Sequence, residues 1–553
     1  MKKTISVLLC LAVMFSCMSF CLAGFAASGT TYYVDSVDGS DSNSGTSPSQ
    51  AWRTLVKASS QEYTSGDKIL FKSGGIYTGS FTAKGDGTGE NPITVSSYGD
   101  IEKEGKPIIF TRNDDMLFYI HNVNGWTIEN LELIAPDGRG IVISADNDYG
   151  IMKDIAVRNC TMHNIWYHQT EEVGSNYAAV YIYSYGKHTR IENLTLSKLN
   201  IYDCAYGISM MGTTIEWHSD IFISPEESYH QNLLFEDISM NNIFYDGIII
   251  TSANNIVIRN CALINTSLNT DHYTAPMWSH HANNMLIENC EIAGATNYKD
   301  GMAVDFDGWT TNSTYQYIYS HDNIRFINNC VYDNTTKNEN CTVRYCLSVN
   351  DNKADNSLAQ TLNSPAYTDD DTAEYMDNFK FYNNTIINGT TFKMENLRNA
   401  YIANNIFYYD DILQGFRTKR ISSDFNGTGE TYLRKFTGEF TNNCFYGCAI
   451  PLAAKNSVNV DPLFAGDDFE DINSFKLSSS SKLIGKGVQA EENMGERDFF
   501  GNPLTDNHNI GCYEGPGVEN EAASVNIFKS IGRFFCNLLG YAMHVILDIA
   551  EIS

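Results

Sequence analysis

The sequence predicts an all-β fold in which short parallel strands coil into a solenoid, and three observations support this. Asn, Tyr, Thr, Ser and Gly are abundant and only 11 of the 553 residues are Pro, which suits strands and short turns better than a helical bundle. A six-residue pattern recurs through the middle of the chain. The 3.6-residue apolar spacing that leucine-rich and helical repeats carry is missing there.

The recurring pattern reads apolar, polar, Asn, small or apolar, polar, apolar. Clear copies begin at residues 128, 157, 191, 258 and 287. Anchors at 128, 157, 191, 235, 258 and 287 are separated by 29, 34, 44, 23 and 29 residues. Anchor separations with a minimum in the low twenties and an irregular excess above it are expected when each coil has a core path of fixed length and loops of variable length. We expect the Asn to form a bend and to stack on the Asn of the next coil.

Charge and composition limit the function classes. The chain has 66 acidic and 37 basic residues and a formal net charge of -29. Nucleic-acid affinity is carried by clustered Lys and Arg, so we expect no nucleic-acid partner. With 43% hydrophobic residues, the chain can build a large core.

The two ends differ from the repeats. Residues 1–27 combine Lys2, Lys3, an apolar run and small residues, which is typical of a signal peptide. We therefore expect a secreted, extracellular protein, with association to the cell surface as an open alternative. No convincing lipobox is present, which disfavours a lipid anchor. Several of the 14 cysteines follow the repeated Asn, which favours buried thiols over disulfides.

Four further segments are expected along the chain. They are an N-terminal cap with the first coils (28–115), the parallel β-helix repeats (116–450), the final coils with a closing segment (451–515), and a linker with an amphipathic C-terminal helix (516–553). The helix is predicted from apolar residues at helical spacing between 528 and 549. Docking on the solenoid and contact with a membrane surface or a partner both remain open for it.

Several motifs at the two ends carry a family resemblance. They are Tyr33–Asp35 with Gly39–Asp41, Trp52–Leu55, Gly66–Lys72, Asp461–Phe464 and Asn509–Glu514. Together with the repeats, residues 31 to 515 resemble secreted bacterial right-handed parallel β-helix proteins of the pectin-lyase-like superfamily. The resemblance implies a right-handed parallel β-helix that acts on or binds a polysaccharide, as a glycoside hydrolase, lyase, esterase or epimerase.

Two segments were compared with the motifs of that superfamily. Residues 269–271 read Asn-Thr-Asp, as in β-helix polygalacturonases, but the other three motifs of those enzymes are missing. Residues 300–308 are more similar to β-helix proteins related to glycoside hydrolases.

The segment from 300 to 308 carries the candidate catalytic pair. If Val304 and Phe306 point inward, Asp305 and Asp307 point outward from the same strand, with Cα atoms about 6.5 to 7 Å apart. Two such carboxylates can supply the acid and the base or nucleophile of glycoside hydrolysis. The pair is also suited to Ca²⁺, and it could instead only order the turn that follows, so no metal ligand is assigned.

Neighbouring coils bring further candidates to the same face. Parallel strands lie about 4.8 Å apart, so Asp246, a histidine and the aspartate pair are expected to form a transverse row. His280 or His281 would act there as acid, base or orienting group. A shift of one residue in register decides which of the two faces outward.

Four more side chains are candidates for substrate binding. Trp278 and Trp309 could each offer an indole face to a sugar ring. Lys299 and Arg325 could bind the carboxylate of a uronate.

Three functions follow from these residues. The first is a glycoside hydrolase on a plant-type or other extracellular polysaccharide, which requires no cofactor. The second is a lyase or epimerase that acts on uronate polymers with Ca²⁺. The third is a glycan-binding or adhesin-like solenoid without catalysis.

Overall fold

The computed structural model describes residues 29–519 except 147–148, 167–172, 187, 213–227, 270, 330–337, 354–359, 365–375, 390, 395–396, 410–435, 448–449 and 452. The predicted signal peptide and residues 520–553 of the predicted linker and helix lie outside the described residues. None of the helices within the described part of the chain has the length and apolar character needed to cross a membrane.

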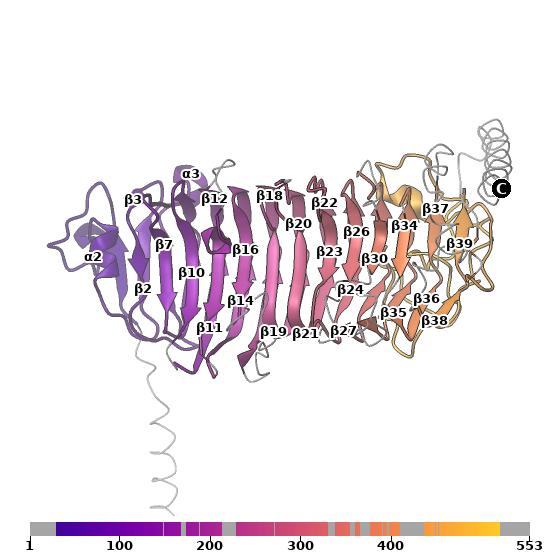
Figure 1. Ribbon diagram of the computed structural model, residues 1–553. Coiled ribbons are helices and arrows are strands. Elements are labelled where there is room, and N and C mark those ends of the chain that lie inside the picture. Colours follow the sequence, from indigo (N-terminus) through magenta and orange to yellow (C-terminus); the bar gives the residue numbers. More distant parts are fainter. Residues whose placement is uncertain are drawn as a thin grey trace, which may run out of the picture.

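The described chain is a parallel β-helix, in which successive coils stack along one axis (Figure 1). A complete coil contributes strands to three faces, and the pairings between named strands are parallel. The all-β parallel fold predicted from the sequence is therefore confirmed.

The first face carries the candidate site. Its strands are β4 (Phe81–Thr82), β7 (Met116–His121), β10 (Arg139–Ala145), β13 (Ala178–Ser184), β16 (Tyr206–Met211), β19 (Ile248–Arg259), β21 (Met277–Glu288), β23 (Met302–Phe306), β26 (Arg325–Asn329), β30 (Gln360–Ser364) and β34 (Thr391–Met394). Because β19 and β21 have 12 residues each, they turn the corner and continue into the second face.

The second face begins at the N-terminal end of the described chain and includes the continuing parts of β19 and β21. Its other strands are β1 (Thr31–Val34), β2 (Lys68–Lys72), β5 (Ile93–Tyr98), β8 (Trp126–Glu129), β11 (Ile151–Arg158), β14 (Arg190–Ser197), β17 (His230–Glu236), β24 (Thr314–Gln316), β28 (Thr342–Arg344), β32 (Lys380–Tyr382), β36 (Ala400–Ala403) and β38 (Gly438–Thr441). The short strands β27 (Asn338–Glu339), β31 (Met376–Asp377) and β35 (Leu397–Arg398) form a separate ladder.

The third face is a separate sheet of 13 strands. They are β3 (Ile76–Thr78), β6 (Ile108–Phe110), β9 (Glu132–Ala135), β12 (Thr161–Ile165), β15 (Asn200–Cys204), β18 (Ser239–Ile243), β20 (Ala262–Thr266), β22 (Glu291–Ala293), β25 (Tyr319–His321), β29 (Leu347–Val349), β33 (Thr385–Ile387), β37 (Ile406–Tyr408) and β39 (Cys444–Tyr446).

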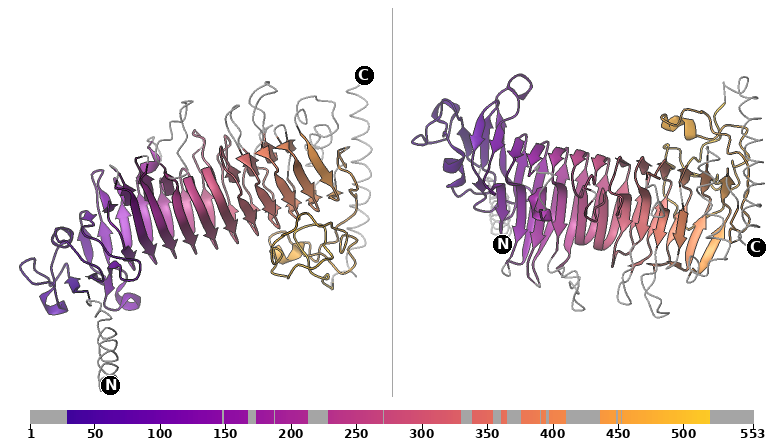
Figure 2. Two further views of the ribbon diagram at one scale, coloured as in Figure 1. Left: turned by 90° about the horizontal axis from the view of Figure 1, so that it is seen from below. Right: turned by 45° about the horizontal axis from the view of Figure 1, so that its top comes forward.

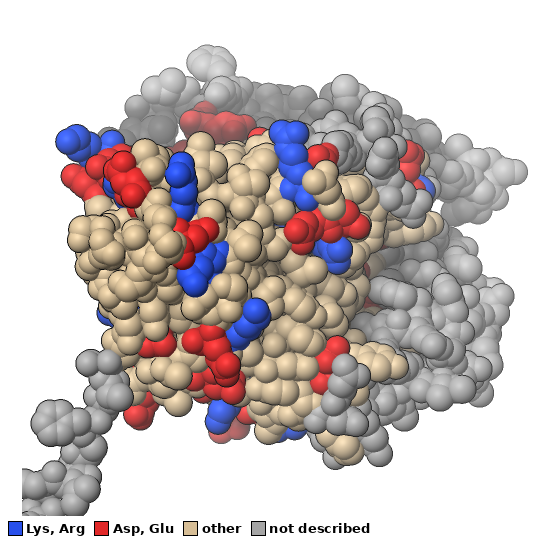
Figure 3. Space-filling model, turned by 90° about the vertical axis from the view of Figure 1, so that its left-hand side faces the viewer, with Lys and Arg blue, Asp and Glu red and all other residues tan. Residues whose placement is uncertain are grey.

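The helices of the described residues are few and short. They are η1 (Pro48–Gln50), α2 (Leu55–Ser59), α3 (Ile101–Glu104), η2 (Ser175–Tyr177) and η4 (Ile472–Phe475). α2 lies at the N-terminal end of the solenoid (Figure 1). Seen from that end, acidic and basic side chains are interspersed on the surface (Figure 3).

The repeated asparagines form the bends that the sequence predicts. Asn130 and Asn159 have φ angles of 61° and 51°, a left-handed conformation that Asn tolerates better than most residues. The Asn159 Nδ2 donates to Asn130 Oδ1 at 2.6 Å, across one coil of 29 residues. Such side-chain ladders fix the path of the chain where each strand ends.

The register corrects one of the predicted repeats. Val157 pairs with Leu196, which pairs in turn with Phe235, so the copy proposed to begin at Ile191 is displaced by five residues. Ile191 lies at the opposite end of the same strand. The error arises because Asn193 is a bend residue as well, with φ 56°, at a second corner that has its own asparagine ladder.

The interior is filled by apolar side chains from all three faces, and Trp126 is fully buried among them. The cysteines that the structure describes are free, buried thiols, as predicted: Cys160, Cys204, Cys261, Cys290, Cys341, Cys346, Cys444 and Cys512.

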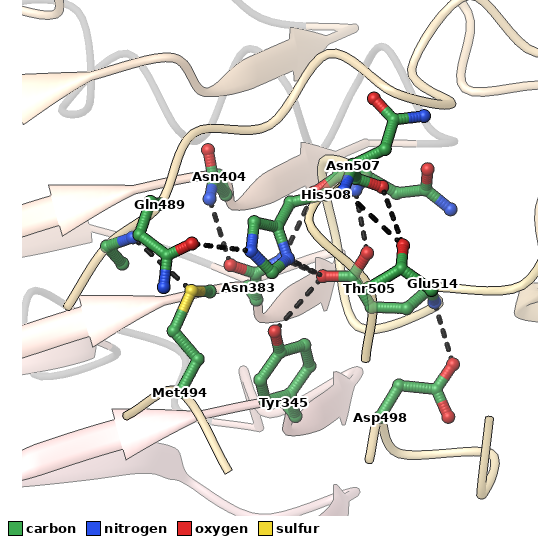
Figure 4. Close-up of polar contacts among 12 residues, drawn as sticks. Tyr345, Asn383, Asn404, Gln489, Met494, Asp498, Thr505, Asn507, His508 and Glu514 are labelled. Carbon is green, nitrogen blue, oxygen red and sulfur yellow. Dashed lines mark hydrogen bonds and ion pairs between the residues drawn. The ribbon is translucent and has the colours of Figure 1, made fainter. Parts of the chain in front are cut away.

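The closing segment, residues 461–515, lies alongside the last coils (Figure 2). It covers apolar side chains of the third face, among them Leu347 and Ile406. The buried Glu514 carboxylate accepts hydrogen bonds from Tyr345 Oη (3.0 Å) and Asn383 Nδ2 (3.1 Å) of two coils (Figure 4). It also bonds His508 Nδ1 of the segment itself, at 3.2 Å.

Candidate functional site

Asp305 lies on the outer side of β23. Its neighbours Val304 and Phe306 are fully buried members of the core, so Asp305 is directed away from the interior. In register it stands between Trp278 of β21 and Asn328 of β26. Asn328 Nδ2 donates to Asp305 Oδ2 at 2.9 Å. Asp305 Oδ1 is buried and has no hydrogen-bond partner among the described residues.

Asp307 follows on the same side of the chain. Its backbone N–H donates to Ser279 O at 2.9 Å, and its Oδ1 accepts from Gly308 N at 3.1 Å. The expectation that Asp305 and Asp307 face solvent is wrong, because they are only 6% and 8% exposed. Strand alternation sets the direction of a side chain but not its exposure, and the large Trp278 stands directly beside Asp305.

Burial changes the acidity of Asp305. Desolvation raises its pKa well above the usual range, and the negative charge of Asp307 raises it further. The hydrogen bond from Asn328 and the charge of Arg325 oppose this shift. Asp305 therefore favours the protonated, neutral form.

Asp246 is buried just before β19 of the first face, two coils before Asp305. Its Oδ1 accepts hydrogen bonds from Ala275 N and from the Trp278 indole N–H, both at 2.8 Å. Desolvation raises its pKa to about 7, and the charge of Asp300 contributes. Trp278 is half-buried, and it holds this carboxylate with its indole N–H.

Asp300 is a further candidate that the sequence did not indicate. It is half-buried just before β23. Desolvation raises its pKa to about 6, while the Arg325 charge acts in the opposite direction. Asp300 precedes the strand, so strand alternation could not indicate where it points. The signal that was available is the spacing of three aspartates within eight residues, 300 to 307.

The structure distinguishes His280 from His281. Ser279 pairs with Phe306 and its carbonyl accepts from Asp307 N, whereas His281 N donates to Gly308 O, so the regular pairing ends before His280. His281 lies within β21 at its corner, with φ 52°, and its ring stacks on Trp309 with centroids 4.5 Å apart.

The two histidine rings also contact each other. Their Nδ1 atoms lie 2.7 Å apart, so one Nδ1–H donates a hydrogen bond and the other Nδ1 accepts that bond. Both side chains are buried, and desolvation lowers the pKa of His281 to about 4 and that of His280 well below 6.5. The pair is therefore neutral at neutral pH.

The two predicted cations lie beside the carboxylates but bind backbone groups. The Lys299 ammonium donates to the Asp271 carbonyl and stands 5.5 Å from the Tyr273 ring centroid. The buried Arg325 donates from Nη2 to Lys299 O at 3.1 Å. Arg325 is also the cation whose charge reaches both Asp300 and Asp305.

The acidic side chains do not form a recognisable metal centre. Within the described parts of the chain, no three His, Cys, Asp or Glu side chains are arranged to hold a metal ion. The four carboxylates at the site are Asp246, Asp300, Asp305 and Asp307.

The comparisons with known proteins concern the fold and a short stretch of sequence. No family model matches the chain. A stretch of 87 residues is 40% identical to a lacto-N-biosidase of Bifidobacterium longum subsp. longum, which is 15% of this chain and only 5% of that protein's length.

Among solved structures, a GH136 lacto-N-biosidase from Eubacterium ramulus matches with a TM-score of 0.55 and 19% identity, over 69% of this chain and 68% of that one. XylC in complex with xylose matches with a TM-score of 0.50 and 12% identity, over 89% and 99% of the two chains. The resemblance in fold to carbohydrate-active parallel β-helix proteins is thus confirmed.

Proposed function

We propose that this protein is a glycoside hydrolase that acts on an extracellular glycan through Asp305 and Asp307. One observation carries the proposal: a buried carboxyl group with a strongly raised pKa lies beside a second carboxylate on the outer side of a parallel strand. The short match to a lacto-N-biosidase and the similar fold of another support a carbohydrate substrate. The signal-like N-terminus supports secretion.

The raised pKa assigns the proton to Asp305. As general acid, Asp305 would give this proton to the glycosidic oxygen as the bond to the anomeric carbon breaks. Ionised Asp307 would then either attack the anomeric carbon or take a proton from the attacking water. The two routes differ in whether the configuration at that carbon is retained or inverted.

The histidine pair and Trp278 are assigned positioning roles. Neutral His280 directly follows Ser279, whose carbonyl accepts from the Asp307 N–H, and its hydrogen bond to His281 fixes its ring. The stacking of His281 on Trp309 fixes the pair in turn. Trp278 holds Asp246 through its indole N–H. We assign these groups to the orientation of the carboxylates.

The charge balance favours a hydrolase over a uronate lyase. Four carboxyl groups surround the site, with Asp305 neutral among them; the Arg325 charge already acts on Asp300 and Asp305, and Lys299 donates to a backbone carbonyl. A uronate polymer brings more negative charge to such a site and would need a cation such as Ca²⁺ to bind. We therefore place the lyase second.

The test uses Asp305→Asn and Asp307→Asn in the full chain, with Asp38→Asn as the matched control. Asp38 is an exposed aspartate at the N-terminal end. Purified proteins are incubated with a panel of neutral and acidic glycans, and new reducing ends are measured. We expect both site variants to lose about 100-fold or more of the turnover, and the control to keep it.

Circular dichroism checks that the fold is intact. Release of reducing ends without an unsaturated-uronate absorbance supports hydrolysis. Unsaturated products that disappear with a chelator would instead identify the lyase. Full activity in both site variants would refute the assignment of the pair.

A further inference from the structure

Two exposed tyrosines lie on the loops before β21 and β23. Among the described residues, three tyrosines belong to the exposed large hydrophobic side chains: Tyr185, Tyr273 and Tyr298. Tyr273 is the most exposed of them, at 76%. It lies on the loop before β21, and Tyr298 lies on the adjoining loop before β23. Two of the three therefore stand directly before the strands that carry Trp278 and Asp305.

The loop that carries Tyr273 is held in place by its neighbours. The fully buried Asn297 donates from Nδ2 to Thr274 Oγ1 at 2.7 Å and to the His272 carbonyl. Ser267 Oγ donates to Thr274 O at 2.7 Å. On the other side of Tyr273, Asn269 Oδ1 accepts from Asp271 N at 2.6 Å. The backbone on both sides of Tyr273 is thus fixed before any ligand arrives.

Lys299 connects this ring to the acids. Its ammonium stands 5.5 Å from the Tyr273 ring centroid and donates to the Asp271 carbonyl, which ties the two loops together. A cation over an aromatic ring is attractive and restricts both partners. Lys299 is the chain neighbour of Asp300, so the residue that contacts the exposed ring directly precedes a candidate-site aspartate in the chain.

We propose that Tyr273 is a sugar-binding platform, on which a pyranose ring of the bound glycan stacks while an adjacent part of the glycan reaches the carboxylates. Tyrosine suits this role because it offers a large amphipathic face and loses little conformational freedom on binding. The inference rests on the proposed function, since it places the platform at the same site. It adds a binding residue that does not take part in the chemistry.

Binding, not turnover, tests this proposal. The full chain with Asp305→Asn, which keeps a bound glycan intact, is applied to an array of neutral oligosaccharides that includes lacto-N-biose and xylo-oligosaccharides. Affinity for the strongest binder is then measured by calorimetry. We expect Tyr273→Ala to weaken it about tenfold and Tyr273→Phe, which keeps the ring, to retain it. The matched control is Tyr185→Ala. Tyr185 is an exposed tyrosine that follows the C-terminal end of β13, whereas Tyr273 precedes the N-terminal end of β21.

Each outcome decides the question. Loss of affinity in Tyr273→Ala alone supports the platform, even if no hydrolysis is ever detected. Equal affinity of Tyr273→Ala and Tyr185→Ala overturns it, even if Asp305 and Asp307 prove catalytic. Failure of the Asp305→Asn protein and of the unsubstituted protein to bind any member of the array also overturns it.

Discussion

At the scale of single residues, burial rather than residue type decides the chemistry of the site. Asp246 and Asp38 are both aspartates, yet Asp246 is buried and its pKa is raised to about 7, whereas Asp38 is largely exposed. The sequence predicted that Asp246, Asp305 and Asp307 share one face. It could not predict how strongly each is desolvated, because this depends on side chains of neighbouring coils.

The raised pKa of Asp246 predicts a pH-dependent stability. A carboxyl group whose pKa is higher in the folded state stabilises the fold below its unfolded pKa, and this contribution is lost as the pH rises through the folded value. Between about pH 4 and pH 7, Asp246 should cost the folded state up to about 4 kcal/mol. Asp246→Asn removes the charge but keeps an oxygen for Trp278 and Ala275.

Urea unfolding at several pH values measures this effect. We expect the two proteins to unfold at similar urea concentrations near pH 4. The variant should become progressively more stable than the unsubstituted chain as the pH approaches 7.5. Parallel curves across this range would show that Asp246 is not desolvated in the folded protein.

At the scale of elements, asparagine ladders define the coils. The sequence predicted asparagine bends, and the structure has them. The sequence could not show that two different corners of a coil both use asparagine. Asn159 and Asn193 follow similar short patterns yet stand at different corners, so the repeat at 191 was placed in the wrong register. Only strand pairing, which links Val157 to residues 29 positions before it and 39 positions after it, separates the corners.

A buried asparagine ladder should contribute more to the free energy of unfolding than an exposed one. Asn405 is fully buried and donates from Nδ2 to Phe381 O and Asn443 Oδ1, while its Oδ1 accepts from the side chain of Asn384. Asn405→Ala leaves these groups unpaired away from water. We expect a loss of about 3 kcal/mol in the free energy of unfolding, measured by urea denaturation.

The control is an exposed rung of a ladder. Asn340 bonds Asn312 Oδ1 at 2.9 Å and has φ 56°. Glycine accepts this φ angle, and water can replace the two lost bonds, to Asn312 and from Asn378, so Asn340→Gly should cost less than about 1 kcal/mol. Equal losses of unfolding free energy in the two variants would mean that burial does not determine how much an asparagine ladder stabilises the fold.

At the scale of the whole molecule, the closing segment joins parts of the chain that are far apart in sequence. Glu514 bonds Tyr345, 169 residues away, and the Arg497 guanidinium lies 3.9 Å from the Tyr317 ring centroid. The sequence indicated a closing segment from its end motifs. It could not indicate that the segment folds back along the coils, because no local pattern encodes such contacts.

Glu514 should control the attachment of this segment. Its side chain is 1% exposed and accepts hydrogen bonds from Tyr345, Asn383 and Asn509 N. Glu514→Ala leaves these donors unpaired in a buried place, which favours local opening of the segment over unfolding of the coils. We expect trypsin to cleave after the exposed Lys486 at least about tenfold faster than in the unsubstituted protein.

The matched control is Glu470→Ala, which removes an exposed glutamate of the same segment. It should leave the rate of cleavage unchanged, and mass spectrometry of the fragments identifies the cut. In Glu514→Ala the coils before residue 461 should remain intact while the segment is lost, because their strands keep their own ladders and core. Simultaneous digestion of coils and segment would show instead that the closing segment and the solenoid unfold as one cooperative unit.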